Sequence, residues 1–218
     1  MIQGDRGSIN YRDEVVRKLI HLCSLSIPIV YYFISKTSAI IILSIVTLAA
    51  LIIDISRYFF PSASKLFYSI FGFLLREHEV DTQKKNLNGA TYVMLSAVIC
   101  VIIFPKIIFI TAFSILIISD SLAALIGRKY GRHKFLSKSL EGTLTFFVSA
   151  IVVVLFTPKV EGMLSEYLIG FTASVIGAIV ENISFGFADD NLSVPVSIGA
   201  TMWLLYLIFF PNLNLILG

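Results

Sequence analysis

One polar stretch, residues 120–142, interrupts a chain that is otherwise strongly apolar. It begins with an isolated acid, Asp120, near the end of an apolar run, and continues through two glycines, five basic residues and one histidine. It ends with a polar group at the start of the next apolar run: Lys138, Ser139, Glu141 and Gly142. Carboxylates hold divalent cations, while basic groups and glycine N–H donors hold phosphates. These residue types therefore predict a site for a phosphorylated ligand and a divalent cation.

Asp120 is the first candidate for a metal ligand and a catalytic group. It lies six residues before the end of its apolar run, which is about 9 Å along a helix. An acid at that depth in a membrane helix is unfavourable, so it is a functional candidate by default. Small residues follow on its helix face and leave room beside the carboxylate. The alternative is that Asp120 only pairs with an arginine and holds two helices together.

The segment 127–139 could surround phosphate groups. Its glycines would let backbone N–H groups approach an anion, and its basic side chains would neutralise the charge. The candidates are Gly127, Arg128, Gly131, Arg132, Lys134 and Lys138. Glu141 lies one helical turn after Lys138, so its carboxylate could face the same ligand and hold Mg²⁺. The segment is not a Walker A motif, and membrane topology alone could also make such a loop basic.

A second acidic group consists of Asp189, Asp190 and Asn191, in a short gap without basic residues. Adjacent acids suit Mg²⁺ or a general base that takes the proton of an attacking hydroxyl. We expect Asp189 and Asp190 to be catalytic, and Asp190 to be a metal ligand as well. Aspartate and asparagine also cap helices, so Asp189 or Asn191 could simply begin the next helix.

Four residues are possible contacts for a lipid or a phosphate: Arg17, His21, Glu181 and Asn191. Arg17 and His21 are four residues apart and share one helix face. Arg17 could bind a phosphate or a lipid head group, while His21 could instead form an ordinary hydrogen bond between helices. Glu181 shares its face with small residues, which predicts a position at a helix–helix contact rather than in lipid.

The composition places these residues in an integral membrane protein. Of the 218 residues, 57% are hydrophobic and 14% are charged, whereas a soluble domain has about a quarter charged residues. Membrane spans are helices of roughly 20 residues, because lipid offers no partner for backbone polar groups. We therefore expect an all-α polytopic bundle, a single domain over 1–218. The seven expected spans are 19–35, 38–56, 88–104, 107–126, 140–157, 163–183 and 193–210, with a short interfacial or loop helix at 61–75.

The basic residues predict the orientation. Segment 1–18 has four of them and the second and fourth gaps have five each, whereas the first, third and fifth gaps have one each. By the positive-inside rule, the N-terminal segment 1–18 and the loop 127–139 are cytoplasmic. Twelve of the fourteen acids fall on the same side, although acids contribute little to topology. A polar site at the cytoplasmic face would explain both distributions.

The run from Asp120 to Gly131, followed by Lys138 to Gly142, resembles the polyprenol kinase family. This family includes dolichol kinases, phytol kinases and CTP-dependent diacylglycerol kinases. Three other blocks agree with it: Arg17–Leu22, Asn88–Tyr92 and Asp189–Pro195. The resemblance spans nearly the whole chain. It implies transfer of a nucleotide γ-phosphate, often from CTP, to the hydroxyl of a membrane lipid alcohol, with Mg²⁺. It also implies that Gly127–Gly142 binds the nucleotide, with Ser139, Glu141 and Gly142 included.

Two other functions share some of these features. CDP-diacylglycerol synthases have a similar block and bind CTP, but they end in a His-Gly-Gly segment that this chain lacks. A lipid or anion transporter would place substrate near the midplane, whereas the outer half of this bundle has charges only at its rim. We expect in-line transfer, with Mg²⁺ held by Asp120 and by Glu141 or Asp190. Lys138 and Arg128 would stabilise the transferring phosphoryl group.

Overall fold

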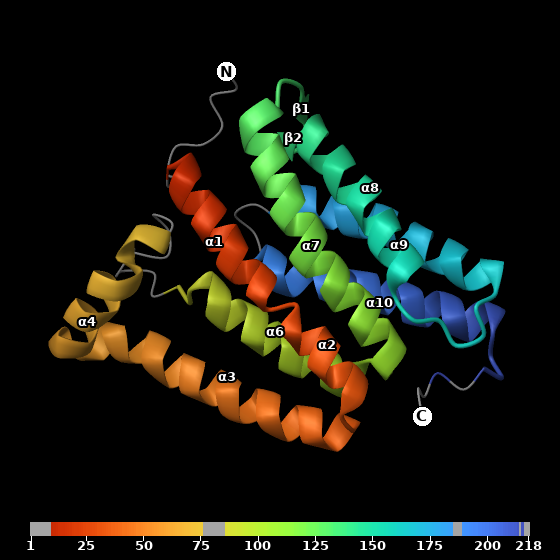
Figure 1. The fold of residues 1–218 in the computed structure, drawn as a ribbon, viewed down its shortest axis with the longest axis horizontal. Coiled ribbons are helices and arrows are strands. Elements are labelled where there is room, and N and C mark those ends of the chain that lie inside the picture. The colour runs from red at the N-terminus through yellow and green to blue at the C-terminus, as the bar shows by residue number, and fades with distance from the viewer. Residues whose placement is uncertain (1–9, 76–85, 185–188, 214, 216–218) are drawn as a thin grey trace.

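The computed structural model describes residues 10–75, 86–184, 189–213 and 215, and most of these are helical (Figure 1). The helices, in chain order, are α1 (Tyr11–Cys23), α2 (Ser26–Phe33), α3 (Lys36–Phe59), α4 (Pro61–Phe71), the 3₁₀ helix η1 (Gly72–Leu74), α6 (Gly89–Ile103), α7 (Lys106–Tyr130), α8 (Leu140–Phe156), α9 (Leu164–Ile183) and α10 (Asp190–Phe209). Two short strands, β1 (Lys134–Phe135) and β2 (Lys138–Ser139), form an antiparallel hairpin between α7 and α8.

Five helical segments of the described chain are long and apolar enough to cross a membrane. α1 and α2 together count as one of them, and the others are α3, α7, α9 and α10. α6 and α8 are also apolar but shorter, with 15 and 17 residues. The predicted all-α membrane bundle is confirmed, and each of its seven spans corresponds to one of these segments. The expected short helix at 61–75 is α4 followed by η1.

The first segment differs from its prediction in two ways. The helix begins at Tyr11 rather than near residue 19, because the charged residues Glu14 and Lys18 are buried against the rest of the bundle. It is also broken between α1 and α2. Pro28 has no N–H to continue the ladder of helical hydrogen bonds, and the N–H of Ile27 bonds to Ser24 in a tighter turn, at 2.9 Å.

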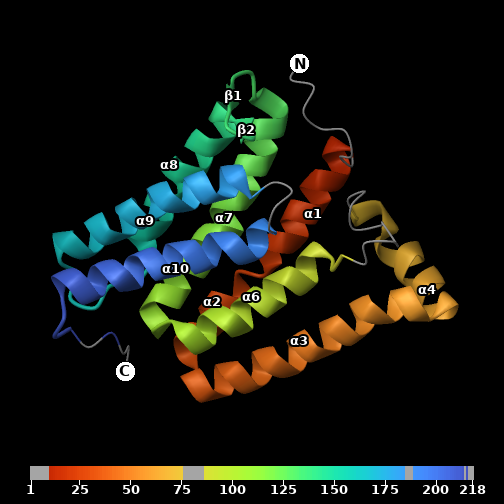
Figure 2. The ribbon, with the colours of Figure 1, turned by 180° about the vertical axis from the view of Figure 1, so that it is seen from behind.

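α7 is the central helix of the bundle. In its most apolar stretch of 18 residues, 83% of the residues are buried inside the molecule. In the corresponding stretch of α3, only 22% are buried. α8, α10, α1 and α2 all pack against α7, and the two opposite views show it surrounded by them while α3 and α4 lie at the periphery (Figures 1 and 2). Polar side chains on α7 therefore point into protein contacts rather than lipid.

Two glycines set the approach of α7 to α8. A Cβ on Gly127 would lie 3.3 Å from the Cα of Gly142, and a Cβ on Gly142 would lie 3.2 Å from the carbonyl oxygen of Ala123. α7 continues to Tyr130, so the predicted loop at 127–139 is shorter than expected and Gly127 lies in the helix. Larger side chains at these two positions would push the helices apart.

Candidate functional site

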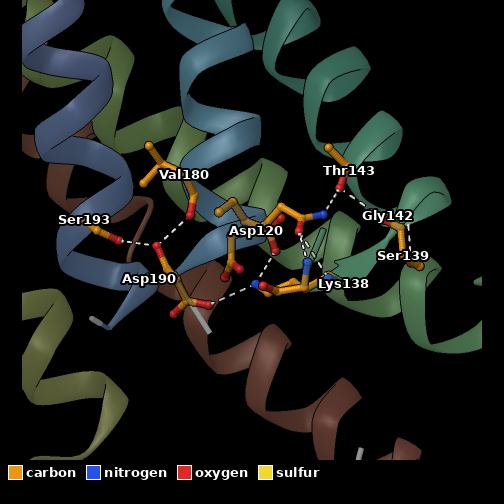
Figure 3. A network of polar contacts seen from close by, with 12 residues as sticks. Asp120, Lys138, Ser139, Gly142, Thr143, Val180, Asp190 and Ser193 are labelled. Carbon is orange, nitrogen blue, oxygen red and sulfur yellow. Dashed lines mark hydrogen bonds and ion pairs between the residues drawn. The ribbon is translucent and has the colours of Figure 1, made fainter. Parts of the chain in front are cut away.

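Four charged side chains lie close together: Asp120, Lys138, Glu181 and Asp190. We call them the charged cluster, and Lys138 on strand β2 is at its centre. Its Nζ lies 2.5 Å from the Glu181 carboxylate of α9 and 3.6 Å from the Asp190 carboxylate of α10. Figure 3 shows Asp120, Lys138 and Asp190 converging from α7, the hairpin and α10. Burial alone would lower the pKa of Lys138, but Glu181, Asp190 and Asp120 outweigh it and raise this pKa above its ordinary value. The ammonium is therefore charged at neutral pH.

Asn182 holds the strand that carries Lys138. Its side-chain oxygen accepts hydrogen bonds from the backbone N–H groups of Ser137, at 2.8 Å, and of Lys138, at 3.1 Å. Its amide nitrogen donates to Thr143 on α8 at 2.6 Å. Asn182 is completely buried, so losing these bonds would leave polar atoms unsatisfied. Asn182 is not among the residues predicted from the sequence, although an amide beside Glu181 in an apolar run was a usable signal.

Asp120 forms a buried ion pair with Lys18 of α1. Its carboxylate also lies 3.8 Å from the Nε2 of His21, so one face of α1 supplies both neighbours. The expected partner of a merely structural Asp120 was an arginine, whereas the observed one is a lysine that the sequence analysis did not select. Lys18 follows the selected Arg17 directly, and its four-residue spacing to Glu14 places both on the buried face of α1.

Arg17 and Arg128 meet at a second acid. Arg17 lies 3.0 Å from the Glu14 carboxylate, and Arg128 of α7 lies 3.2 Å from its other oxygen. Glu14 is only 1% exposed, and the sequence analysis did not select it. The Nε of Arg17 is buried without a hydrogen-bond partner within the described residues. Glu14 thus places two guanidinium groups side by side near the α1–α7 contact, where they could bind phosphate oxygens.

The two acids at the beginning of α10 have different contacts. Asp189 is the N-cap of α10, and its Oδ1 accepts hydrogen bonds from both the backbone and the side-chain nitrogen of Asn191, at 3.0 and 2.8 Å. This is the capping alternative that the sequence left open. Asp190 instead points to Lys138. Asp190 therefore belongs to the charged cluster.

Glu141 binds to the hairpin itself. It pairs with the Nδ1 of His133 at 2.8 Å and accepts the backbone N–H of His133 as well. Ser139 caps α8 by accepting the N–H of Gly142 at 3.2 Å. Gly131 and Lys134 lie in or beside the exposed part of the hairpin. The Glu141 carboxylate therefore binds His133 of the hairpin, whereas Asp120 pairs with Lys18 and Asp190 with Lys138.

The Asn88–Tyr92 block serves a structural role at the start of α6. The side chain of Asn88 accepts the N–H of Thr91 at 2.9 Å, which caps the helix. The backbone N–H of Asn88 donates to the buried Asp54 at 2.7 Å, and Asp54 pairs with Arg57 at 2.9 Å. The C-terminal half of α3 is thereby attached to the beginning of α6.

The carboxylates of the cluster could supply only part of the ligands of a divalent cation. Within the described residues, no group of three or more His, Cys, Asp or Glu is placed to hold a metal ion. Mg²⁺ in phosphoryl-transfer sites commonly takes one or two carboxylates, with phosphates and waters as its other ligands. Asp120, Glu181 and Asp190 offer such carboxylates, and lysines neutralise them until a ligand arrives.

No protein-family model and no solved structure matches the chain. An uncharacterized protein of Rickettsia prowazekii is 32% identical over 185 residues, 84% of this chain and 90% of that protein. CTP-dependent diacylglycerol kinase 1 of Schizosaccharomyces pombe is 30% identical over 168 residues, 71% of this chain and 74% of that protein. The chain belongs to the polyprenol kinase family. Phytol kinase of Synechocystis sp. is 34% identical over 90 residues, 38% of each chain.

Membership of the polyprenol kinase family confirms the resemblance noted in the sequence. The named relatives are kinases of diacylglycerol and of phytol, so the family relationship makes this protein a membrane lipid kinase. Apart from Glu181, the charged cluster and its neighbours on α1 lie on the blocks that carry the resemblance. Lys18 and His21 come from the first block, Asp120 and Lys138 from the central one, and Asp190 from the last.

Proposed function

We propose that the protein transfers the γ-phosphate of CTP to the hydroxyl of a membrane lipid alcohol at the cytoplasmic face. The observation that carries the proposal is the convergence of Asp120, Lys138, Glu181 and Asp190 from four separate elements. Phosphoryl transfer needs positioned cations and carboxylates more than covalent chemistry. The distribution of basic residues supports a cytoplasmic location, where nucleotide is available.

In this proposal the acceptor oxygen attacks the γ-phosphorus while the bond from that phosphorus to the β–γ bridging oxygen breaks and CDP leaves. The acceptor proton passes to the Asp190 carboxylate, because Asp189 is engaged as a helix cap. Lys138 and the Arg17–Arg128 pair stabilise the phosphate charge. Mg²⁺, when bound, would neutralise charge on the phosphate oxygens, and Asp120 would be its protein ligand. Gly127–Gly142 is the proposed nucleotide-binding stretch.

An assay with labelled CTP tests this function. The purified protein in detergent micelles is incubated with Mg²⁺ and with diacylglycerol, phytol or dolichol in separate reactions. We expect label from the γ-position of CTP to appear in the lipid. Incorporation of CMP from α-labelled CTP, with release of pyrophosphate, would instead identify a cytidylyltransferase. If neither product forms with any of the lipids, the kinase proposal is rejected and a transport function is favoured.

A further inference from the structure

Two lysines lie together at the end of the bundle opposite the charged cluster. Lys36 is the first residue of α3 and Lys106 is the first residue of α7. Lys106 precedes Asp120 by fourteen positions in α7, which is about 21 Å along a helix. Both line one cavity of about 690 Å³, between the α2–α3 turn, the α6–α7 turn and α10. These turns lie near the end of α10 that leads to the C-terminus (Figure 2).

The walls of this cavity are mainly apolar and aromatic. Tyr32, Phe33 and Trp203 line it together with Ile103. Phe33 is 78% exposed and Ile103 is 45% exposed, so the cavity is continuous with the apolar surface that faces lipid in a membrane protein. Aromatic side chains gather at the depth of lipid head groups. The position at the first residues of two membrane helices places the lysines at that same depth.

The lysines retain hydrogen-bonding capacity for a ligand. Lys36 donates to the carbonyl oxygens of Ile102 and Phe104, at 3.0 and 3.3 Å, and Lys106 donates to that of Tyr32 at 3.2 Å. Each ammonium has three donors, so within the described residues one donor of Lys36 and two of Lys106 form no hydrogen bond, and the Lys106 ammonium also lies 5.4 Å from the Tyr31 ring centroid. Within the described residues neither lysine has an acidic partner, in contrast to Lys18 and Lys138 at the other end.

The N-terminal ends of α3 and α7 also favour an anion at this cavity. A lysine at the beginning of a helix lies next to the positive end of the helix dipole, where anions are favoured and cations are not. Two such ends, each with a lysine, line this one cavity. The carbonyl contacts at the C-terminal ends of α2 and α6 compensate part of each positive charge, but no acidic side chain among the described residues pairs with either lysine.

We propose that this cavity binds the head group of an acidic phospholipid. The two ammonium groups would contact the phosphate, and the aromatic and aliphatic walls would contact the glycerol region and the first part of the acyl chains. Charge complementarity favours an anion, and the exposed apolar surface beside the cavity favours one attached to a lipid. The site is separate from the proposed phosphoryl-transfer site and does not depend on it.

Trp203 gives a direct measurement, because it is the single tryptophan of the chain and it lines the cavity. The protein is reconstituted into phosphatidylcholine vesicles that contain either brominated phosphatidylglycerol or brominated phosphatidylcholine as a minor component. Bromine quenches tryptophan fluorescence only at short range. We expect the acidic lipid to quench Trp203 with an apparent affinity about tenfold higher than the zwitterionic lipid.

Charge variants separate this site from ordinary lipid contact. The double variant Lys36→Gln/Lys106→Gln retains donors for the carbonyl contacts but should lose the preference for phosphatidylglycerol, while Lys36→Arg/Lys106→Arg should keep it. Lys159→Gln is the matched control, because Lys159 bonds to Val154 and Thr157 and does not line the cavity. Equal quenching by both lipids in the unaltered protein, or an unchanged preference in the glutamine variant, would overturn the proposal.

Discussion

Pairing of opposite charges is the main property of the site at the scale of residues. Asp120 has Lys18 beside it, and Glu181 and Asp190 share Lys138. Pairing reduces the free energy required to bury charges, although such pairs add little net stability compared with apolar packing. The cluster contains three carboxylates near two ammonium groups and contributes little to folding. A role in binding or catalysis therefore explains it better than a role in stability.

Asp120 can be tested for a role beyond its ion pair. Asp120→Asn leaves the Lys18 ammonium without its partner and should lower the melting temperature as well as abolish phosphoryl transfer. The double variant Asp120→Asn/Lys18→Gln removes both charges and should recover most of the thermal stability. We expect it to remain inactive in the labelled-CTP assay. Recovery of activity together with stability would mean that Asp120 only holds α1 against α7.

Lys138 should matter for transfer much more than another basic residue does. Lys138→Ala removes the charge between Glu181 and Asp190, and we expect kcat to fall by about 100-fold or more. Lys65→Ala on the exposed face of α4 serves as the control and should change kcat by less than about twofold. The measurement is the rate of lipid phosphorylation by equal amounts of folded protein. A similar loss in both variants would point to general charge effects.

At the scale of elements, the short hairpin between α7 and α8 positions Lys138. Two observations explain how two strands of two residues each keep one geometry. Asn182 accepts the N–H groups of Ser137 and Lys138, and the Glu141–His133 pair closes the other side. A hairpin of this size would be unstable alone, so α9 and α8 determine its position.

Removal of the Asn182 amide should therefore loosen the hairpin. Asn182→Ala leaves the backbone N–H groups of Ser137 and Lys138 without their acceptor, and we expect faster hydrogen exchange at both. Transfer activity should fall by about tenfold or more, since the Lys138 ammonium loses its fixed position. Thr143→Val, which loses only the contact on α8, is the milder comparison. Unchanged exchange in Asn182→Ala would show that the hairpin is held by other contacts.

The contact between α7 and α8 gives a test of packing. A Cβ on residue 142 would lie 3.3 Å from the Cα of Gly127 and 3.2 Å from the carbonyl oxygen of Ala123, which is already tight. The larger side chain of Gly142→Val would therefore clash with the backbone of α7. Overpacking of this kind costs about 1–3 kcal/mol, so the melting temperature should fall. Gly72→Ala is the control, because its Cβ would meet nothing closer than 3.8 Å. Equal melting temperatures would show that the two helices can separate without cost.

At the scale of the whole molecule, charge is distributed between the two ends of one bundle. The charged cluster lies toward the ends of α7 and α9 and the beginning of α10, and the positive-inside rule predicts that this end is cytoplasmic. The opposite end has Lys36, Lys106 and Lys159, each bonded to carbonyl oxygens at helix ends. These three lysines, which lie at the end predicted to face outward, thus bind the carbonyl oxygens at the ends of helices.

Cysteine labelling in intact cells checks the orientation. In a background without Cys23 and Cys100, the single variants Lys134→Cys and Glu161→Cys introduce thiols at opposite ends of α8. A membrane-impermeant maleimide should label the second from outside and leave the first unlabelled until the membrane is permeabilised. Labelling of Lys134→Cys in sealed cells would reverse the predicted topology and move the proposed nucleotide site to the outside.

The sequence alone determined the helical spans and the family. Apolar runs of roughly 20 residues must form helices in lipid, because the backbone has no other partner there. The polar types that carry the chemistry were also visible, since an acid such as Asp120 stands out in an apolar run. The selection of Asp120, Lys138, Glu181 and Asp190 depended on these local patterns, and the structure brings all four together.

Only the tertiary structure decided which charges meet. Lys18 and Asp120 are 102 residues apart, and Lys138 and Glu181 are 43 apart, so their contacts depend on how the helices cross and rotate. Local spacing suggested that Glu141 would join Lys138, but the hairpin turns it toward His133. Spacing along one helix cannot encode such distant pairs, because they arise from packing between helices, and the glycines at 127 and 142 set that packing.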